Sequence, residues 1–204
     1  MIDWKFIEEL EGKNILHGYV PLDRLGNVIG QSGVTIGTGV DLGQMDRGEL
    51  VTLLRGEPDS FNLLSKLLPY VGIKTDSAIN ALKRKPLEIT EGEAVLLSKV
   101  TKEKILKELV RKWTYYNHTD FYKLPDEAQT VLFSLAYNFG SNLPERLPNT
   151  WDAFVRSSKN NDWQLAVSFM MQFPSKNKEL DNRRRREAFL LSNLLRLPID
   201  KDVA

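Results

Sequence analysis

Glycine is concentrated in one short part of the chain, and this concentration restricts the fold more than any other feature of the sequence. Six of the thirteen glycines lie between residues 26 and 43. Glycine adopts backbone conformations that other residues avoid, so a segment this rich in it must turn repeatedly. Within it, Val34, Ile36 and Val40 alternate with small or polar residues, which is the period of a strand with one buried face. The segment predicts a small β element built around tight turns.

Helical patterns occupy the rest of the chain. Trp4, Ile7 and Leu10 recur at the spacing of an amphipathic helix that ends near residue 11. The run Thr90-Glu91-Gly92-Glu93 has the form of a capping box and predicts a helix over about 91–113. The same kinds of pattern predict further helices over about 60–68, 76–85, 126–139, 150–157, 161–172 and 183–197.

The length of the chain indicates how these elements are organised. At 204 residues it can form one sizeable hydrophobic core but not two ordinary domains with a linker. We therefore expect a single domain over 1–204, with a β-containing lobe at about 12–60 and a helical lobe at about 61–204. The helix over 1–11 is expected to pack at a cleft between them. One helix, a small β element and then only helices make an α+β fold, and the cleft is the default place for an active site.

Charge and composition remove several classes of protein. Lys and Arg number 28 against 27 Asp and Glu, so bulk charge does not recruit nucleic acid. The four arginines at 183–186 would point around most of a helix and form no single basic stripe. The chain has no cysteine, and its two histidines lack metal-ligand spacing, so we expect no metal. Gly37-Thr38-Gly39 lacks the third glycine of a dinucleotide-binding motif, so we expect no cofactor. The charged start predicts no signal peptide, and no apolar run is long enough for membrane insertion.

Carboxylates remain as the candidate catalytic groups, because glycoside hydrolysis needs two of them. Glu11 ends the first predicted helix beside a glycine, and Asp41 lies in the β element. Thr35 and Asp41 are six residues apart, which in a straight strand would separate them by about 20 Å. They can act together only if the chain reverses near residues 37–39. The residues alone leave two non-catalytic alternatives open. Glu11 could be a solvated carboxylate at a helix end, and residues 33–43 could be a plain glycine-rich hairpin.

The chain resembles the phage-type lysozymes in four motifs that occur in the order found in that family and span about residues 8–195. The first is Glu11-Gly12 followed by GVTIGTGVDLG at 33–43, which resembles the active-site segment. The others are ITEGEA at 89–94, which resembles a helix start, FSLAYNFG at 133–140, which resembles the central core helix, and NRRRRE at 182–187, which resembles the arginine-bearing last helix. The resemblance implies a lysozyme-like α+β fold with the active site in a cleft.

One departure points to a branch of that family. The T-even phage enzymes carry the catalytic aspartate nine residues after the glutamate, but Val20 stands there in this chain, and Asp23 is off that spacing. The sequence instead resembles the pesticin-like bacteriocins and effectors, in which the aspartate follows the threonine by six residues. The resemblance then implies Glu11 as the general acid, Asp41 as the second carboxylate and Thr35 as the hydroxyl that holds water. Asp23 is the alternative to Asp41.

The same resemblance implies substrate-binding residues in the helical lobe. They are Asn138, in the core-helix motif, together with Arg183 and Arg186 in the last helix. Arg183, with Arg186 as the second candidate, is expected to face the cleft and pair with Glu11, while the two arginines between 183 and 186 are expected to be solvated. A threonine that holds water has a role only if water attacks directly. We therefore expect an inverting enzyme, with carboxylates roughly 6.5–9.5 Å apart.

The activity implied is that of a muramidase, which cleaves the β-1,4 bond between N-acetylmuramic acid and N-acetylglucosamine in peptidoglycan glycan strands. The alternatives are a lytic transglycosylase and a non-catalytic peptidoglycan-binding module of the same fold. We expect a monomer that acts on the cell wall, in the periplasm of a target bacterium. Delivery through a secretion apparatus, receptor-mediated import or a holin stays open. For a toxin or effector, we expect a cognate immunity protein in the producing cell.

Overall fold

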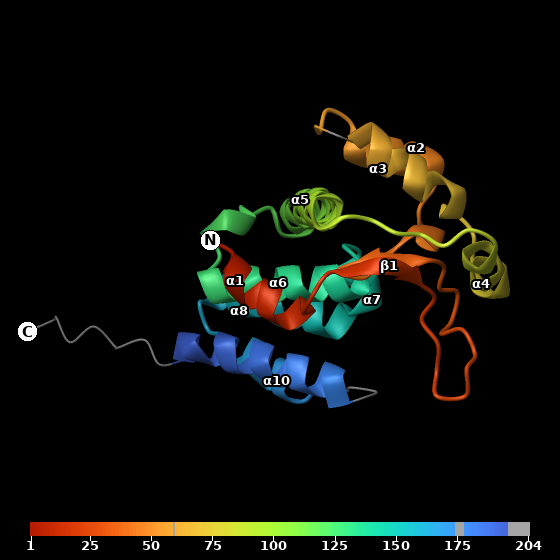
Figure 1. The fold of residues 1–204 in the computed structure, drawn as a ribbon. Coiled ribbons are helices and arrows are strands. Elements are labelled where there is room, and N and C mark those ends of the chain that lie inside the picture. The colour runs from red at the N-terminus through yellow and green to blue at the C-terminus, as the bar shows by residue number, and fades with distance from the viewer. Residues whose placement is uncertain (59, 174–177, 196–204) are drawn as a thin grey trace, which may run out of the picture. The chain divides into compact units, whose positions relative to one another are not determined.

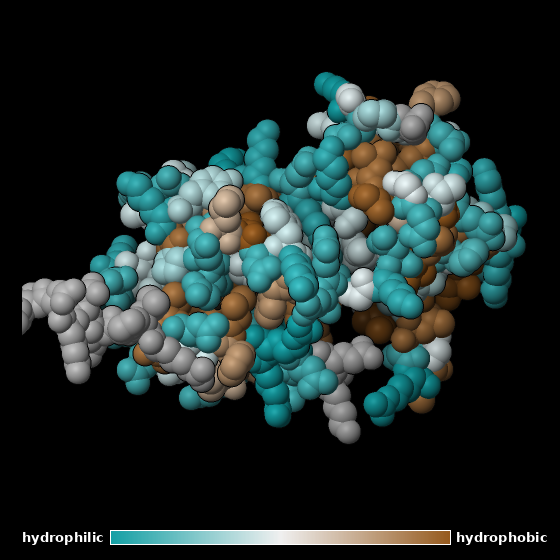
Figure 2. Space-filling model, turned by 60° about the vertical axis from the view of Figure 1, so that its left-hand side comes forward, coloured by the Kyte–Doolittle hydropathy of each residue, from teal (hydrophilic) through white to brown (hydrophobic). Residues whose placement is uncertain are grey.

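The structure is a computed structural model that describes residues 1–58, 60–173 and 178–195. It is mostly helical, with one small antiparallel sheet (Figure 1). The predicted α+β class is therefore confirmed. Among the described residues, no helix is long and apolar enough to span a bilayer. The face drawn in Figure 2 is largely hydrophilic, with hydrophobic residues in separate areas.

The chain divides into two compact units. The first, here called the helical unit, comprises Met1–Leu10 and the chain from Ile105 onward, and the second, the sheet unit, comprises Glu11–Lys104. We expected the β-containing lobe to end near residue 60, but residues 61–104 group with the sheet. The reason is visible in the core of the sheet unit, where Leu63, Leu67 and Leu97 pack with Ile36 of the sheet and its neighbour Val34.

The sheet has three strands in the order β1 (Ile15–Tyr19), β2 (Thr35–Gly37) and β3 (Val40–Asp41). Ile36 pairs with Val40, so the chain reverses over residues 37–39. Gly37 and Gly39 both have positive φ, of 65° and 96°, which explains why this reversal uses glycine. The predicted turn is confirmed, whereas β1 was not predicted from the sequence.

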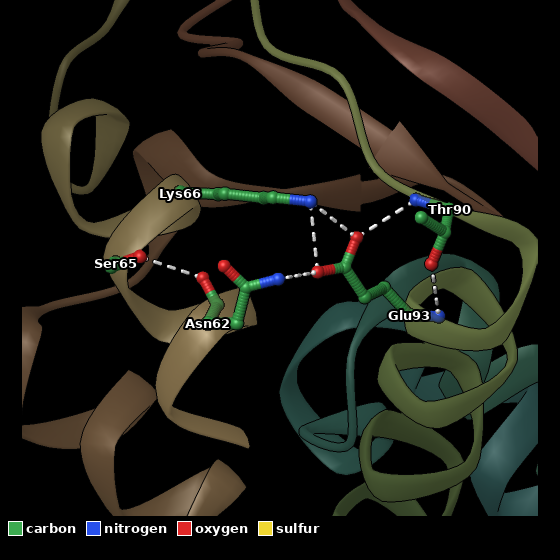
Figure 3. Close-up of polar contacts among 5 residues, drawn as sticks. All are labelled: Asn62, Ser65, Lys66, Thr90 and Glu93. Carbon is green, nitrogen blue, oxygen red and sulfur yellow. Dashed lines mark hydrogen bonds and ion pairs between the residues drawn. The ribbon is translucent and has the colours of Figure 1, made fainter. Parts of the chain in front are cut away.

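Helices cover the sheet within its own unit. They are α2 (Arg47–Leu54), α3 (Ser60–Leu67), α4 (Thr75–Arg84) and the first half of α5 (Glu91–Asn117), with short 3-10 turns at η1 (Leu42–Gln44) and η2 (Leu68–Tyr70). The predicted capping box begins α5, because Thr90 N donates to Glu93 Oε2 at 2.8 Å and Glu93 N donates to Thr90 Oγ1 at 3.2 Å (Figure 3). The sequence reading missed α2, although Asp46 and Glu49 cap it in the same way.

The helical unit is built around α6 (Asp126–Phe139), in which nine consecutive residues from Ala128 to Ala136 are buried. The helix α10 (Lys178–Ser192) runs beside it (Figure 1). This arrangement confirms α6 as the central core helix. The remaining elements of the unit are α1 (Trp4–Glu11, except for its last residue), α7 (Leu143–Arg146), α8 (Pro148–Asn160), α9 (Gln164–Met171), η3 (Phe121–Lys123) and η4 (Asn193–Leu195). The last helix was expected at 183–197; it begins five residues earlier, and residues 196–197 lie outside the described residues.

Candidate active site

Glu11 is the last residue of α1, and Gly12 follows it with a φ of 74°. Only 2% of the Glu11 side chain is exposed, and its Oε2 lies 3.3 Å from Nζ of Lys102, a residue of α5. The Lys102 side chain is itself mostly buried. The alternative that Glu11 is a solvated carboxylate at a helix end is therefore wrong. A buried carboxylate is expensive without a partner, and the lysine supplies one.

Thr35 and Asp41 lie directly opposite each other in the antiparallel register of β2 and β3. Residues in such a pair project from the same face of the sheet, with their Cβ atoms about 4.5–5.5 Å apart. The six-residue spacing that separates them in sequence therefore brings them together in space. Thr35 is 3% exposed, and its Oγ1 donates to the Gly33 carbonyl at 3.4 Å. The plain hairpin of the sequence analysis is present, and it carries both candidate residues on one face.

The Asp41 carboxylate is held by backbone donors on both sides of the hairpin. Its Oδ1 accepts from Gly33 N at 3.0 Å and from Gly43 N at 2.9 Å. Among the described residues, no donor to its other oxygen, Oδ2, is seen. One oxygen thus fixes the orientation of the carboxylate, while the other is available to a substrate or a water molecule.

The two glycines that hold Asp41 are required by close backbone packing. A Cβ at Gly33 would lie 2.4 Å from the Ile73 carbonyl oxygen and 2.5 Å from the Gly43 Cα. A Cβ at Gly43 would lie 2.7 Å from the Gly33 Cα. These distances are shorter than van der Waals contact, so any side chain at either position would separate the two segments. Gly33 and Gly43 therefore position the Asp41 carboxylate, in addition to the turns that glycine allows in this segment.

Asp23, the alternative second carboxylate, has a different role. It is exposed and lies in the loop between β1 and β2. Its Oδ1 accepts the backbone N–H groups of Leu25 at 2.8 Å and Asn27 at 2.9 Å. The hydrogen bond from the Asn27 backbone, followed by the other donors of this turn, outweighs desolvation and lowers the Asp23 pKa. Asp23 thus stabilises a turn, and it is absent from the strand pair that carries Thr35.

A residue that sequence reasoning missed completes the sheet side of the site. Tyr19, the last residue of β1, lies directly opposite Thr35. Its pKa is raised, first by burial and second by the negative charge of Asp41. Tyr19, Thr35 and Asp41 therefore form one row across the three strands. The only sequence signal for Tyr19 is its nearness to the candidate region, because the register between β1 and β2 is not encoded locally.

Two of the three candidate residues of the helical unit, Arg183 and Asn138, contact a buried ionic network around Glu187. Arg183 Nη2 donates to Ser134 Oγ at 2.9 Å, and its Nε donates to Glu187 Oε1 at 3.3 Å. Arg184 Nη2 donates to Asn138 Oδ1 at 3.2 Å, and its Nη1 lies 2.7 Å from Glu187 Oε2. Burial raises the Glu187 pKa despite the opposing effect of the nearby arginines.

The expectation that Arg184 is solvated is wrong. It is 2% exposed, and its guanidinium lies over the rings of Phe139 and Phe173 at 5.3 and 5.4 Å. Burial lowers its pKa to about 10. Arg186 is half exposed, with its Nη2 2.6 Å from Glu9 Oε2, and its role in binding substrate stays a prediction. Arg185 is exposed, as expected, and pairs with Asp181.

The three proposed catalytic residues, Glu11, Thr35 and Asp41, all belong to the sheet unit. The three proposed substrate-binding residues, Asn138, Arg183 and Arg186, all belong to the helical unit. Pairing of Arg183 with Glu11 and the separation of the two carboxylates stay predictions. Within the described part of the chain, no group of three or more His, Cys, Asp or Glu residues is arranged to hold a metal ion.

Comparison with protein families now identifies the chain. The family model described as "Pesticin: Bacterial toxin homologue of phage lysozyme, C-term" matches residues 1–164. The chain belongs to the Pesticin family. This confirms the resemblance to the pesticin-like branch that the threonine-to-aspartate spacing indicated. The part matched by the Pesticin model contains the row on the sheet, Glu11 and Asn138, whereas the arginines of α10 lie beyond it. No curated protein matches the chain.

Proposed function

We propose that this member of the Pesticin family is a muramidase that hydrolyses the β-1,4 bond between N-acetylmuramic acid and N-acetylglucosamine in peptidoglycan. The observation that carries the proposal is the Thr35–Asp41 pair on one sheet face, with the Asp41 carboxylate clamped through Oδ1. The buried carboxylate of Glu11 in the same unit supplies the second acid. Kinship with phage lysozyme supports the substrate class.

The proposed reaction needs only these groups and one water molecule. Glu11 donates a proton to the glycosidic oxygen as the bond to the anomeric carbon breaks. Water forms the new bond to that carbon, and its proton passes to Asp41 Oδ2, the oxygen that the backbone leaves open. Thr35 orients the water. Attack from the side opposite the leaving group inverts the anomeric centre, so the first product is the α anomer.

A lytic transglycosylase is the alternative within the enzymes. It would use Glu11 alone and would form an anhydro sugar, leaving Thr35 and Asp41 with structural roles. The clamp on Asp41 favours hydrolysis, because a carboxylate held through one oxygen with the other open is suited to activating water. Mass spectrometry of digested peptidoglycan separates the two reactions, since hydrolysis adds one water, about 18 Da, relative to the anhydro product.

The test of the proposed function is Glu11→Gln, with Glu8→Gln as a control on the same helix. The amide matches the carboxylate in shape but has no acidic proton to give, which should cost roughly 10²–10⁴-fold in rate. Glu8 is exposed one turn earlier, so its variant should lyse cell walls like the wild type. Both are assayed on purified peptidoglycan, with circular dichroism to verify folding. A folded Glu11→Gln protein with wild-type activity would refute the assignment, and a wild type inactive from pH 4 to 8 would indicate a binding module.

The place of action follows from the substrate. We infer that the chain acts on the cell wall of a target bacterium, where the glycan strands are. As a bacterial toxin, it would require a cognate immunity protein in the producing cell, and a protein that fills the site around Asp41 would serve. Adding such a protein in equimolar amount should abolish lysis of peptidoglycan in vitro.

A further inference from the structure

The sheet aligns three polar residues in a single row. Tyr19 is the register partner of Thr35, and Thr35 is the register partner of Asp41. Directly opposed residues of antiparallel strands project from the same face. Neighbouring strands are about 4.7–4.9 Å apart, so Tyr19 and Asp41 flank Thr35 on its two sides. The proposed function uses two members of this row and leaves the third without a role.

The Tyr19 hydroxyl has no hydrogen-bond acceptor among the residues that the structure describes. The residue is half buried, and among the described residues no hydrogen bond of its hydroxyl is seen. Burial and the charge of Asp41 raise its pKa above the ordinary value near 10, so the phenol keeps its proton throughout the working range. The influence of Asp41 also indicates that the hydroxyl lies in the field of that carboxylate. The register therefore places Tyr19 on the same sheet face as Asp41, on the other side of Thr35.

The hydrogen bonds of an attacking water show what that group can do. Water has two O–H bonds and two lone pairs. One O–H points to Asp41 Oδ2, and the other can point to Thr35 Oγ1, whose own hydrogen is directed at the Gly33 carbonyl. One lone pair attacks the anomeric carbon. The second lone pair needs a donor, and neither Asp41 nor Thr35 has a hydrogen left to supply one.

We propose that Tyr19 is a further catalytic residue, whose hydroxyl donates a hydrogen bond to the attacking water and so completes its orientation between Thr35 and Asp41. This inference rests on the proposed function. The balance of the step is unchanged: the water proton goes to Asp41, the new bond forms at the anomeric carbon, and the Glu11 proton leaves with the alcohol. Tyr19 keeps its own proton and can donate the same hydrogen bond to the water of the next catalytic cycle.

The test is Tyr19→Phe, with Tyr115→Phe as the control, assayed on a soluble glycan fragment so that kcat and KM are separated. One hydrogen bond of about 0.5–1.5 kcal/mol corresponds to a loss of up to about tenfold in kcat. KM and the thermal midpoint should be unchanged, because the hydroxyl binds water and not the sugar or the protein. Tyr115 is exposed, and its variant should match the wild type in every parameter.

A double-mutant cycle with Thr35→Val separates a shared water from independent effects. If both hydroxyls orient one water, the double variant should lose less than the product of the two single losses. Multiplicative losses, an unchanged kcat in Tyr19→Phe, or a loss confined to KM would each overturn the inference while Glu11→Gln still tests the proposed function. A lowered thermal midpoint in Tyr19→Phe would show a structural role and would also overturn it. A wild type that does not hydrolyse glycan would remove both proposals.

Discussion

Glu93 connects the start of α5 to α3, and its replacement should destabilise the sheet unit measurably. Its Oε2 accepts from Thr90 N and its Oε1 accepts from Asn62 Nδ2 at 2.9 Å (Figure 3). Lys66 Nζ donates to both oxygens, at 2.9 and 2.7 Å. The Glu93 side chain is 10% exposed and that of Lys66 is 30% exposed. Glu93→Ala removes all of these bonds at once.

The cost follows from two contributions. Loss of the reciprocal cap is worth about 0.5–2 kcal/mol. Breaking the ion pair costs about 3–5 kcal/mol when it is fully buried and about 0–1 kcal/mol at the surface. The half-buried Lys66 places this pair between the two limits, at about 1–2 kcal/mol. Glu93→Ala should therefore lower the free energy of unfolding by about 1.5–4 kcal/mol. For a chain of this size, that is roughly 3–16 °C in the thermal midpoint.

The pH dependence gives a second readout. Burial tends to raise the Glu93 pKa, but hydrogen bonds from Lys66 and Thr90 together with the lysine charge outweigh it, and the pKa lies below its usual value. A lowered pKa in the folded state adds stability above the unfolded value, about 4.3, and this stability is lost as the pH falls through the folded value. The difference between wild type and Glu93→Gln should therefore shrink below about pH 4.

The assay is urea unfolding followed by circular dichroism at pH 7 and at intervals down to pH 3. Glu91→Ala is the matched control, because Glu91 is exposed in the same helical turn, and its variant should change stability by at most about 0.5 kcal/mol. A loss below about 1 kcal/mol in Glu93→Ala, or a difference from Glu93→Gln that stays constant down to pH 3, would refute the reasoning.

Three further predictions concern the other named groups. Asp41→Asn should reduce lysis at least tenfold more than Asp23→Asn in a turbidity assay, because only Asp41 lies in the strand pair with Thr35, and the reverse ranking would move the catalytic role to Asp23. Arg184→Met should lower stability by about 3–5 kcal/mol, since it leaves Glu187 short of its nearest cation, while the exposed Arg185→Met should stay within about 0.5 kcal/mol in the same thermal scans. Gly33→Ala should destabilise by more than about 2 kcal/mol and abolish activity, because its Cβ would overlap two backbone segments; near wild-type stability by urea unfolding would show that these segments separate easily.

Local signals in the sequence predicted much of this fold. The capping box at 90–93, the apolar surface of α6 and the glycine-assisted reversal at 37–39 were each readable from neighbouring residues, and the structure confirms them. The same kind of signal was present and overlooked at Asp46, four residues before the first buried leucine of α2. Gly48 weakens the helical pattern there, because glycine is a poor helix former.

Nonlocal features could not be predicted in this way. Strand β1 is partly exposed along its whole length and shows no clean alternation of apolar and polar residues. Its existence depends on pairing with a strand that begins sixteen residues after β1 ends. That pairing decides that Tyr19 stands in the row with Thr35. The unit boundary between residues 104 and 105 is hidden for a related reason, because it falls inside the continuous helix α5.

The arginine run of α10 carries a sequence signal that distinguishes its buried members from its exposed ones. Residues at i, i+3 and i+4 share a helix face, so Glu187 lies beside both Arg183 and Arg184, and the structure pairs it with both. Because a buried charge needs partners, a glutamate that can pair with two arginines favours burial of the helix face that carries all three residues. Arg185 and Arg186 lack this partner and turn toward solvent, where each meets a different acid. The pattern of charges, more than the resemblance to a family, thus decides which arginines turn inward. It predicts that Glu187→Gln makes both Arg183 and Arg184 more reactive toward a guanidinium-modifying reagent, measured by mass spectrometry of the modified peptides, and unchanged reactivity would contradict this.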